Sequence, residues 1–337
     1  MVEIICIGSS SKDIFFPTSE GMVFDTPEDV TAQKKITFEL GAKYQVEDRY
    51  ESLGGCAANV ASGLARLGIK VDCCTKIGDD MLGRWIIENL SQGGVNTACV
   101  EIEEKCMSDL SAIIVDEKSR DRTIFFNRDA NERLEIKPEM LKKSKWLFVS
   151  ALNGNWKSGI DNIISIAMQN DQRIVFNPGQ RNIKDDVRKI LEMIGNTEIL
   201  MVNKDEAIEI LVKSGEEDEK KLNDEQYLLL KLKNYGPRII TLTDGKRGAW
   251  VYNKEKILYV GATEKNPTET TGGGDAFTSG FIAAYLKGKN IEECLQWGMA
   301  NGASVVNYYG ANKGLLDEYQ MEERLKLIKI DILNKKS

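Results

Sequence analysis

Short apolar runs alternate with amphipathic segments along the whole chain. The amphipathic segments repeat apolar residues at helical spacing and cover 57–67, 84–92, 159–169, 185–193, 204–212, 224–233, 277–286, 291–307 and 318–333. The apolar runs end at glycine or polar residues, as strands buried on both faces do, and cover 2–7, 71–76, 146–150, 173–177, 199–202, 239–243 and 249–252. This alternation predicts an α/β protein with a mainly parallel central sheet.

Two segments depart from this alternation. Residues 34–51 are polar and β-leaning, and residues 111–115 and 122–127 resemble a hairpin around a polar turn. Both interrupt connections of the parallel sheet, so we expect them to pair into a small β-sheet lid. The lid would comprise insertions at about 14–52 and 106–128 in a single domain of residues 1–337. Such a lid could exclude water from a reaction.

Composition narrows the functional classes. The chain has 337 residues, 42% of them hydrophobic and 29% charged, which is ordinary for a globular protein. A net charge of −7 argues against nucleic-acid binding. Apolar stretches fall short of the ~20 residues that cross a membrane, and the first run is short for a signal peptide. Seven scattered cysteines suit reduced thiols. We therefore expect a cytoplasmic protein with no membrane association.

The chain contains no histidine. Histidine-dependent nucleophilic catalysis, histidine general bases and histidine-ligated zinc are therefore excluded together. Catalysis by this chain would have to use carboxylates, lysine, arginine, backbone amides or a metal held by oxygen ligands.

The strongest chemical motif is the segment Thr270-Thr271-Gly272-Gly273-Gly274-Asp275, which leads into an apolar helix. Glycines allow backbone N–H groups to approach a ligand, and the helix dipole adds positive potential. Gly272, Gly273 and Gly274 could thus form an anion hole for a transferring phosphoryl group. Asp275 could accept the proton of an attacking hydroxyl, although an aspartate that only caps the helix is the simpler alternative. A dinucleotide fingerprint would need glycine where Phe277 stands.

The segment 269–275 resembles the C-terminal signature of the PfkB/ribokinase family of carbohydrate and nucleoside kinases. Gly54-Gly55-Cys56-Ala57-Ala58-Asn59-Val60-Ala61 resembles the N-terminal signature of that family, about 215 residues earlier. The resemblance covers essentially the whole chain. It implies a ribokinase-like three-layer α/β/α sandwich with a mainly parallel central sheet and a small β-sheet lid. It also implies transfer of a phosphoryl group from ATP, with Mg²⁺, to a hydroxyl of a small sugar.

The resemblance also assigns roles to individual positions. It implies that the acceptor is bound by Asp13, Gly54, Gly55 and Asn59, and that Arg128 could reach it from the lid hairpin. Glu206, in the motif Asn203-Lys204-Asp205-Glu206, would lie near Mg²⁺, through water. The implied nucleotide-binding residues are Asn203, Thr243, Gly245, Gly248 and Asn301.

Several alternatives remain open at this point. Glu269 stands where the family usually has aspartate, a position tied to a monovalent cation such as K⁺. The loop Asn177-Pro178-Gly179-Gln180 is similar to adenosine-kinase-like members and favours a nucleoside acceptor. A catalytically inactive nucleotide-binding paralogue is a further alternative, against which the intact Asp275 argues. Some relatives pair through their lids, so a homodimer through the lid is one of the oligomeric states left open.

Overall fold

A sheet of ten strands forms the centre of the molecule in the computed structural model, which describes residues 2–25, 34–142, 144–216, 218–254, 256–264 and 267–333. The seven strands from β7 to β13 are parallel, and three antiparallel strands extend the opposite edge. In spatial order they are β16 (Asp331–Leu333), β15 (Ile257–Val260), β14 (Ala249–Tyr252), β13 (Ile239–Thr243), β12 (Ile199–Asn203), β11 (Arg173–Phe176), β10 (Trp146–Val149), β1 (Ile4–Ile7), β6 (Val71–Gly78) and β7 (Val100–Glu103).

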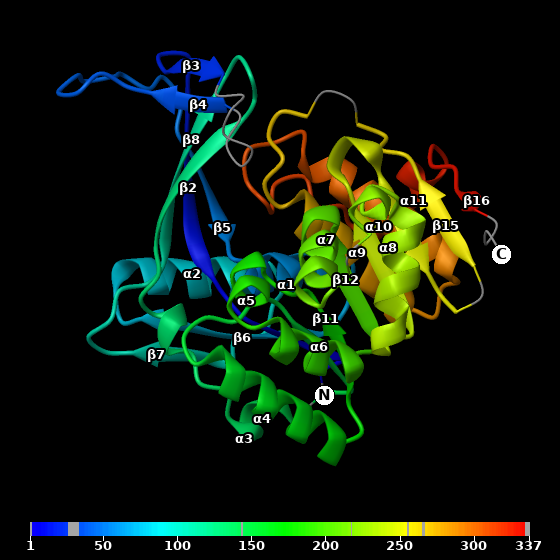
Figure 1. The fold of residues 1–337 in the computed structure, drawn as a ribbon. Coiled ribbons are helices and arrows are strands. Elements are labelled where there is room, and N and C mark those ends of the chain that lie inside the picture. Colours follow the sequence, from blue (N-terminus) through cyan, green and yellow to red (C-terminus); the bar gives the residue numbers. More distant parts are fainter. Residues whose placement is uncertain are drawn as a thin grey trace.

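Helices cover both faces of this sheet (Figure 1). One face carries α1 (Cys56–Arg66), α2 (Met81–Gln92), α9 (Gly273–Leu286), α10 (Ile291–Val305) and α11 (Glu318–Leu325). The other carries α3 (Pro138–Leu141), α4 (Trp156–Gln169), α5 (Gln180–Asp185), α6 (Val187–Gly195), α7 (Lys204–Lys213) and α8 (Glu225–Leu232). The predicted three-layer α/β/α sandwich is confirmed.

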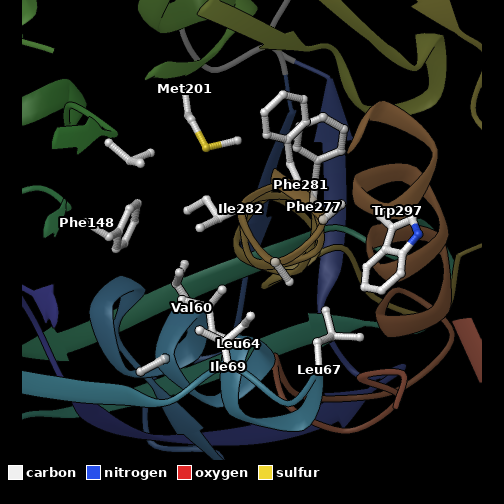
Figure 2. Close-up of a cluster of buried hydrophobic side chains, with 14 of the residues drawn as sticks. Val60, Leu64, Leu67, Ile69, Phe148, Met201, Phe277, Phe281, Ile282 and Trp297 are labelled. Carbon is white, nitrogen blue, oxygen red and sulfur yellow. The ribbon is translucent and has the colours of Figure 1, made fainter. Parts of the chain in front are cut away.

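Inner strands of this sheet contribute alternate residues to two separate hydrophobic cores, because successive strand side chains point to opposite faces. In β1, Ile4 belongs to the core under α1 and α9, whereas Ile5 belongs to the core under α4 to α8. Figure 2 shows the first core, where Val60 and Leu64 of α1 approach Ile282 of α9. This packing brings together two helices from distant parts of the sequence.

A second, four-stranded sheet extends from one end of the sandwich (Figure 1). We call it the lid sheet. Its order is β5 (Tyr50–Gly54), β2 (Ser11–Thr18), β8 (Leu110–Asp116) and β9 (Arg122–Asn127), with β2 and β8 parallel. A two-stranded ribbon, β3 (Met22–Asp25) and β4 (Lys34–Thr37), lies near its far tip. Residues 26–33 of the expected insertion 14–52 lie outside the described residues.

One strand was not predicted, and two helix boundaries were wrong. Strand β2 was missed because its Ser-Lys-Asp start lacks an apolar run. The helix predicted from 277 begins at Gly273, because two glycines form its first turn. The helix predicted over 318–333 ends at Leu325, and β16 then pairs with β15. Among the described helices, none has the length and apolar character needed to cross a membrane.

Candidate active site

The motif residues converge where the lid sheet meets the carboxyl ends of the parallel strands. Loops that follow β12 and β13 reach this edge, as does the N-terminus of α9. Ligands of open α/β sheets bind at such an edge because the strand connections leave a crevice there. The N-terminus of α1 joins the same edge, since α1 packs against α9.

Asp275 lies half-buried in the first turn of α9, where two side chains of α1 fix its carboxylate. Asn59 Nδ2 donates to Asp275 Oδ2 at 2.8 Å, and Cys56 Sγ lies 2.9 Å from Oδ1. Burial raises the pKa of Asp275, whereas the Cys56 and Asn59 hydrogen bonds lower it and the negative charge of Asp13 raises it. The same contact and burial raise the pKa of the Cys56 thiol well above its usual range, so this thiol acts as a donor.

The glycine triplet shapes the start of α9. Gly272 has φ 78°, and a Cβ there would lie 2.3 Å from the Cβ of Ala311, so a side chain would clash as well as strain the backbone. Gly273 N–H donates to the carbonyl of Thr270 at 3.3 Å. Gly274 is exposed, with open space where its Cβ would be. The backbone of the first turn is therefore accessible to an anion beside the Asp275 carboxylate.

The predicted acceptor residues lie together at the base of the lid sheet. Asp13, on β2, is only 7% exposed, and Ser11 Oγ donates to its Oδ1 at 3.1 Å. A Cβ on Gly54 would lie 2.2 Å from Asp13 Oδ2, so glycine is what allows this carboxylate to lie against β5. Gly55, with φ 87°, precedes the first residue of α1. Asn59 Oδ1 accepts from Asn312 Nδ2 at 3.0 Å, which orients the amide toward Asp275.

Arg128 lies beside this group, directly after β9. Its guanidinium stacks over the Phe126 ring at 5.0 Å, and its Nη1 is 3.7 Å from Asp109 Oδ2. The side chain is 25% exposed, and Nη1 has no hydrogen-bond partner among the described residues. Burial raises the pKa of the Asp13 carboxyl, while the Ser111 and Ser11 hydroxyls and the charge of Arg128 lower it. Arg128 is thus close enough to act on the same region as Asp13.

A cavity of about 280 Å³ lies on the other side of the α9 N-terminus. One wall of this cavity is formed by Thr243, the last residue of β13, and by Gly245 and Gly248 in the turn that follows. Gly248 has φ 99°, and a Cβ there would lie 2.1 Å from the Val260 carbonyl, so the turn requires glycine. The opposite wall is apolar and includes Phe277, Met299, Gly302, Ala303 and Val306. A flat aromatic base fits between such walls, and Gly273 and Gly274 line the end nearest Asp275.

A smaller cavity of about 160 Å³ connects these features and is lined by Asn203, Glu206 and Asp275. Asn203 and Glu206 form a capping box at the start of α7, which holds both side chains at the sheet edge. Burial raises the pKa of Glu206 to about 8, aided by the negative charges of Asp205 and Asp275. The described residues contain no cluster of three or more acidic, cysteine or histidine ligands. A Mg²⁺ ion that keeps most of its waters and binds phosphate oxygens fits a site with only two carboxylates in its lining.

One predicted nucleotide-binding residue lies elsewhere. Asn301 is fully buried; its Nδ2 donates to the Ala276 carbonyl at 3.0 Å, and its Oδ1 accepts from Leu316 N–H at 3.0 Å. Asn301 therefore links α10 to α9 by a hydrogen bond. The adjacent Gly302 and Ala303 line the 280 Å³ cavity. Asn203 lines the smaller cavity rather than the larger one.

Sequence reasoning also missed residues that the structure brings to the site. Cys56 was named only as a member of the N-terminal signature, with no role of its own, although it is the first residue of α1 and contacts Asp275. Asn312 follows α10 in a loop without any motif. Arg122 lies on β9 of the lid sheet, and its side chain donates to Thr270 of the glycine loop. No local sequence pattern identifies this contact. These contacts depend on tertiary packing.

A family model described as "pfkB family carbohydrate kinase" matches residues 28–318. An uncharacterised sugar kinase of Archaeoglobus fulgidus is 30% identical over 258 residues, covering 75% of this chain and 98% of the relative. A ribokinase of Haemophilus influenzae is 28% identical over 284 residues, covering 82% of this chain and 86% of the relative. The match therefore extends over both glycine motifs and most of the sandwich.

Solved structures share the fold. A Methanocaldococcus jannaschii nucleoside kinase, described as an archaeal member of the ribokinase family, has a TM-score of 0.74 at 23% identity, covering 97% of this chain and 99% of that one. A ribokinase of Cryptococcus neoformans in complex with ADP has a TM-score of 0.76 at 23% identity, covering 96% and 100%. At these identities the likeness establishes the fold alone.

Proposed function

The chain belongs to the PfkB family of carbohydrate kinases, and on that premise we propose that it transfers the γ-phosphate of ATP to a hydroxyl group of a small sugar. Membership makes it a phosphotransferase with an alcohol acceptor. The observation that carries the finer proposal is the position of Asp275. Its carboxylate lies at the N-terminus of α9, with the Asp13 group on the lid side and the 280 Å³ cavity on the other.

Asp275 serves as the general base in this proposal. The Asn59 and Cys56 donors hold both carboxylate oxygens and fix the orientation of the group. Burial raises the pKa of this carboxyl and makes the carboxylate a better proton acceptor, whereas the two donors lower that pKa. The attacking hydroxyl needs alignment more than a strong base, because the transition state of phosphoryl transfer is loose.

The backbone of the α9 N-terminus stabilises the charge on the transferred group. Gly272 sets the turn, and the exposed Gly274 leaves its backbone open toward the cavity. Gly273 N–H already has a partner in Thr270, so it contributes mainly through the helix dipole. Backbone donors of this kind are already oriented, so no reorganisation is needed during the reaction.

Thr243, Gly245 and Gly248 bind the nucleotide in this proposal, and the apolar wall at Ala303 contacts the base. Asn203 and Glu206 would hold Mg²⁺ through its water shell, and the ion would neutralise phosphate charge when bound. A monovalent cation such as K⁺ is a further proposal at Glu269. Its buried Oε2 has no hydrogen-bond partner among the described residues, which suits a cation, but Oε1 already pairs with Arg122.

A nucleoside acceptor is the second candidate. Asn177, which begins the Asn-Pro-Gly-Gln loop, lines the cavity next to Asp275, and its Oδ1 lies 3.5 Å from Cys56 Sγ. This contact of Asn177 with the cavity supports a role of the loop in acceptor binding. Asp13 would bind the hydroxyls of a free sugar or of a ribose moiety in the same way, so the two candidates differ in what lies beyond the sugar ring.

A homodimer through the lid is also proposed. Strand β9 is an edge of the lid sheet, and all its residues are exposed, including Ile124, Phe125 and Phe126. An edge strand with exposed aromatic side chains is suited to pairing with a second copy. Sedimentation of the purified protein tests this: the wild type should dimerise, and Phe125→Lys should shift it toward monomer.

The acceptor is tested by measuring ADP release with ATP and Mg²⁺ over ribose, fructose, 2-keto-3-deoxygluconate and adenosine. The proposal expects one of the three sugars to give the highest kcat/KM. Adenosine as the preferred acceptor would support the nucleoside alternative instead. Absence of any acceptor-dependent ADP release would contradict both.

A further inference from the structure

Arg122 connects the lid sheet to the loop that precedes the α9 N-terminus. It is the first residue of β9, and its side chain is 29% exposed. Arg122 Nη1 donates to Thr270 Oγ1 at 2.7 Å, and Nε lies 3.5 Å from Glu269 Oε1. Glu269 and Thr270 are separated from Arg122 by almost half the chain. They belong to the central sandwich, whereas Arg122 belongs to the lid sheet.

The positive charge of the Arg122 guanidinium compensates the buried negative charge of Glu269. The Glu269 side chain is fully buried, and an uncompensated buried carboxylate is costly. Its Oε1 also accepts from the Thr271 N–H and the Thr271 hydroxyl, each at 2.7 Å. Removing Arg122 would leave that carboxylate without the positive partner that the structure gives it. The ion pair therefore favours the conformation in which the lid sheet lies against the loop.

The loop held in this way is the one that sets the anion hole. Thr271 directly precedes Gly272, whose left-handed backbone begins α9, and the Thr270 carbonyl accepts from Gly273 N–H. Thr270 also lines the 280 Å³ cavity together with Gly273 and Gly274. A displacement of the loop would therefore move the glycine backbone relative to the phosphate position.

Resting on the kinase function proposed above, we propose that Arg122 is a positioning residue for phosphoryl transfer. Its bonds to Glu269 and Thr270 fix the anion-hole loop when the lid covers the acceptor. Coverage of the acceptor and assembly of the anion hole are thereby one event.

A second lid arginine provides a matched control. Arg49 is 63% exposed and forms an ion pair with Glu51 at 2.9 Å, within the part of the chain that leads into β5. Its described contacts do not include the 269–271 loop. Arg49→Ala removes an arginine and an ion pair from the same region, so it reports any general effect of weakening the lid.

The test compares Arg122→Ala, Arg122→Lys and Arg49→Ala, each as the full chain, by steady-state kinetics with the best acceptor and by melting temperature. We expect Arg122→Ala to lower kcat about tenfold to a hundredfold, since small misplacements of a catalytic geometry have effects of this size. The KM for ATP should change less than about threefold, as expected for a transition-state effect. Millimolar guanidinium chloride should restore part of the kcat of Arg122→Ala, and Arg122→Lys should be intermediate.

Amide hydrogen exchange of residues 268–275, with a non-hydrolysable ATP analogue and Mg²⁺ bound, gives a readout that does not require an acceptor. Exchange should be faster in Arg122→Ala than in wild type and unchanged in Arg49→Ala. A kcat within twofold of wild type, or exchange equal to that of Arg49→Ala, would overturn the positioning role. A wild-type protein that phosphorylates none of the acceptors would contradict the proposed function, while the exchange comparison would still decide the role of Arg122.

Discussion

The two halves of the candidate site differ in the chemical groups that line them. The proposed nucleotide half consists mostly of backbone and apolar surface on the central sandwich, where strands such as β13 and β14 are buried almost throughout. The proposed acceptor half consists of polar side chains on the lid sheet, whose β9 is exposed along its whole length. A half defined by an apolar shape and a half defined by hydrogen-bonding side chains therefore meet at Asp275. Mutations should separate the kinetic parameters of the two substrates accordingly.

The largest loss of activity is expected at Asp275, where the two halves of the site meet. Asp275→Asn removes the base but keeps the size of the side chain and one acceptor oxygen, which can keep the hydrogen bond from Asn59. We expect kcat to fall by about 10²–10⁴-fold, the range attributed to general base catalysis. Binding of an ATP analogue, measured by calorimetry, should stay within a few-fold of wild type. Retention of wild-type kcat would show that Asp275 only caps the helix.

The next largest effect should be confined to the acceptor half. Asp13→Asn replaces charged with neutral hydrogen bonds to acceptor hydroxyls, a loss of about 1.5–3 kcal/mol. The acceptor KM should therefore rise about tenfold to a hundredfold, while the KM for ATP is unchanged. A parallel rise in both KM values would contradict the division of the site into two halves.

A smaller effect is expected in the nucleotide half. Ala303→Leu adds volume to the apolar wall of the 280 Å³ cavity, and overpacking typically costs about 1–3 kcal/mol. The KM for ATP should rise about tenfold with the acceptor KM unchanged, which is the mirror image of Asp13→Asn. Met168→Ala, at an exposed position on α4, is the control and should leave both KM values unaltered.

The smallest effect should appear at Cys56. Cys56→Ala removes a donor to Asp275, and a single hydrogen bond contributes about 1 kcal/mol, or about fivefold in kcat/KM. Because the bond from Cys56 lowers the pKa of Asp275, its loss should raise that pKa further. The acid limb of the kcat/KM profile should then move to higher pH, since the base becomes protonated at a higher pH. Cys56→Ser keeps a donor and should restore the position of that limb.

Much of this arrangement could be predicted from local patterns. The parallel sheet followed from apolar runs separated by helical spacing, because burial on both faces imposes that pattern. The glycine loop before an apolar helix indicated an anion site, because only particular backbone conformations can offer several N–H groups to one ligand. Because the chain contains no histidine, a carboxylate such as Asp275 was the expected general base. These features depend on residues that are close together in the sequence.

Other features were decided by tertiary structure. The Asp13 strand, the burial of Asn301 between α9 and α10, and the contacts of Cys56 with Asp275 and of Arg122 with Glu269 all join distant segments. The amino-acid sequence by itself determined the layered α/β fold and the chemistry available at the glycine loop, because both arise from local spacing. Only tertiary structure decided which side chains face that loop, because helix packing and lid position set their distances from Asp275.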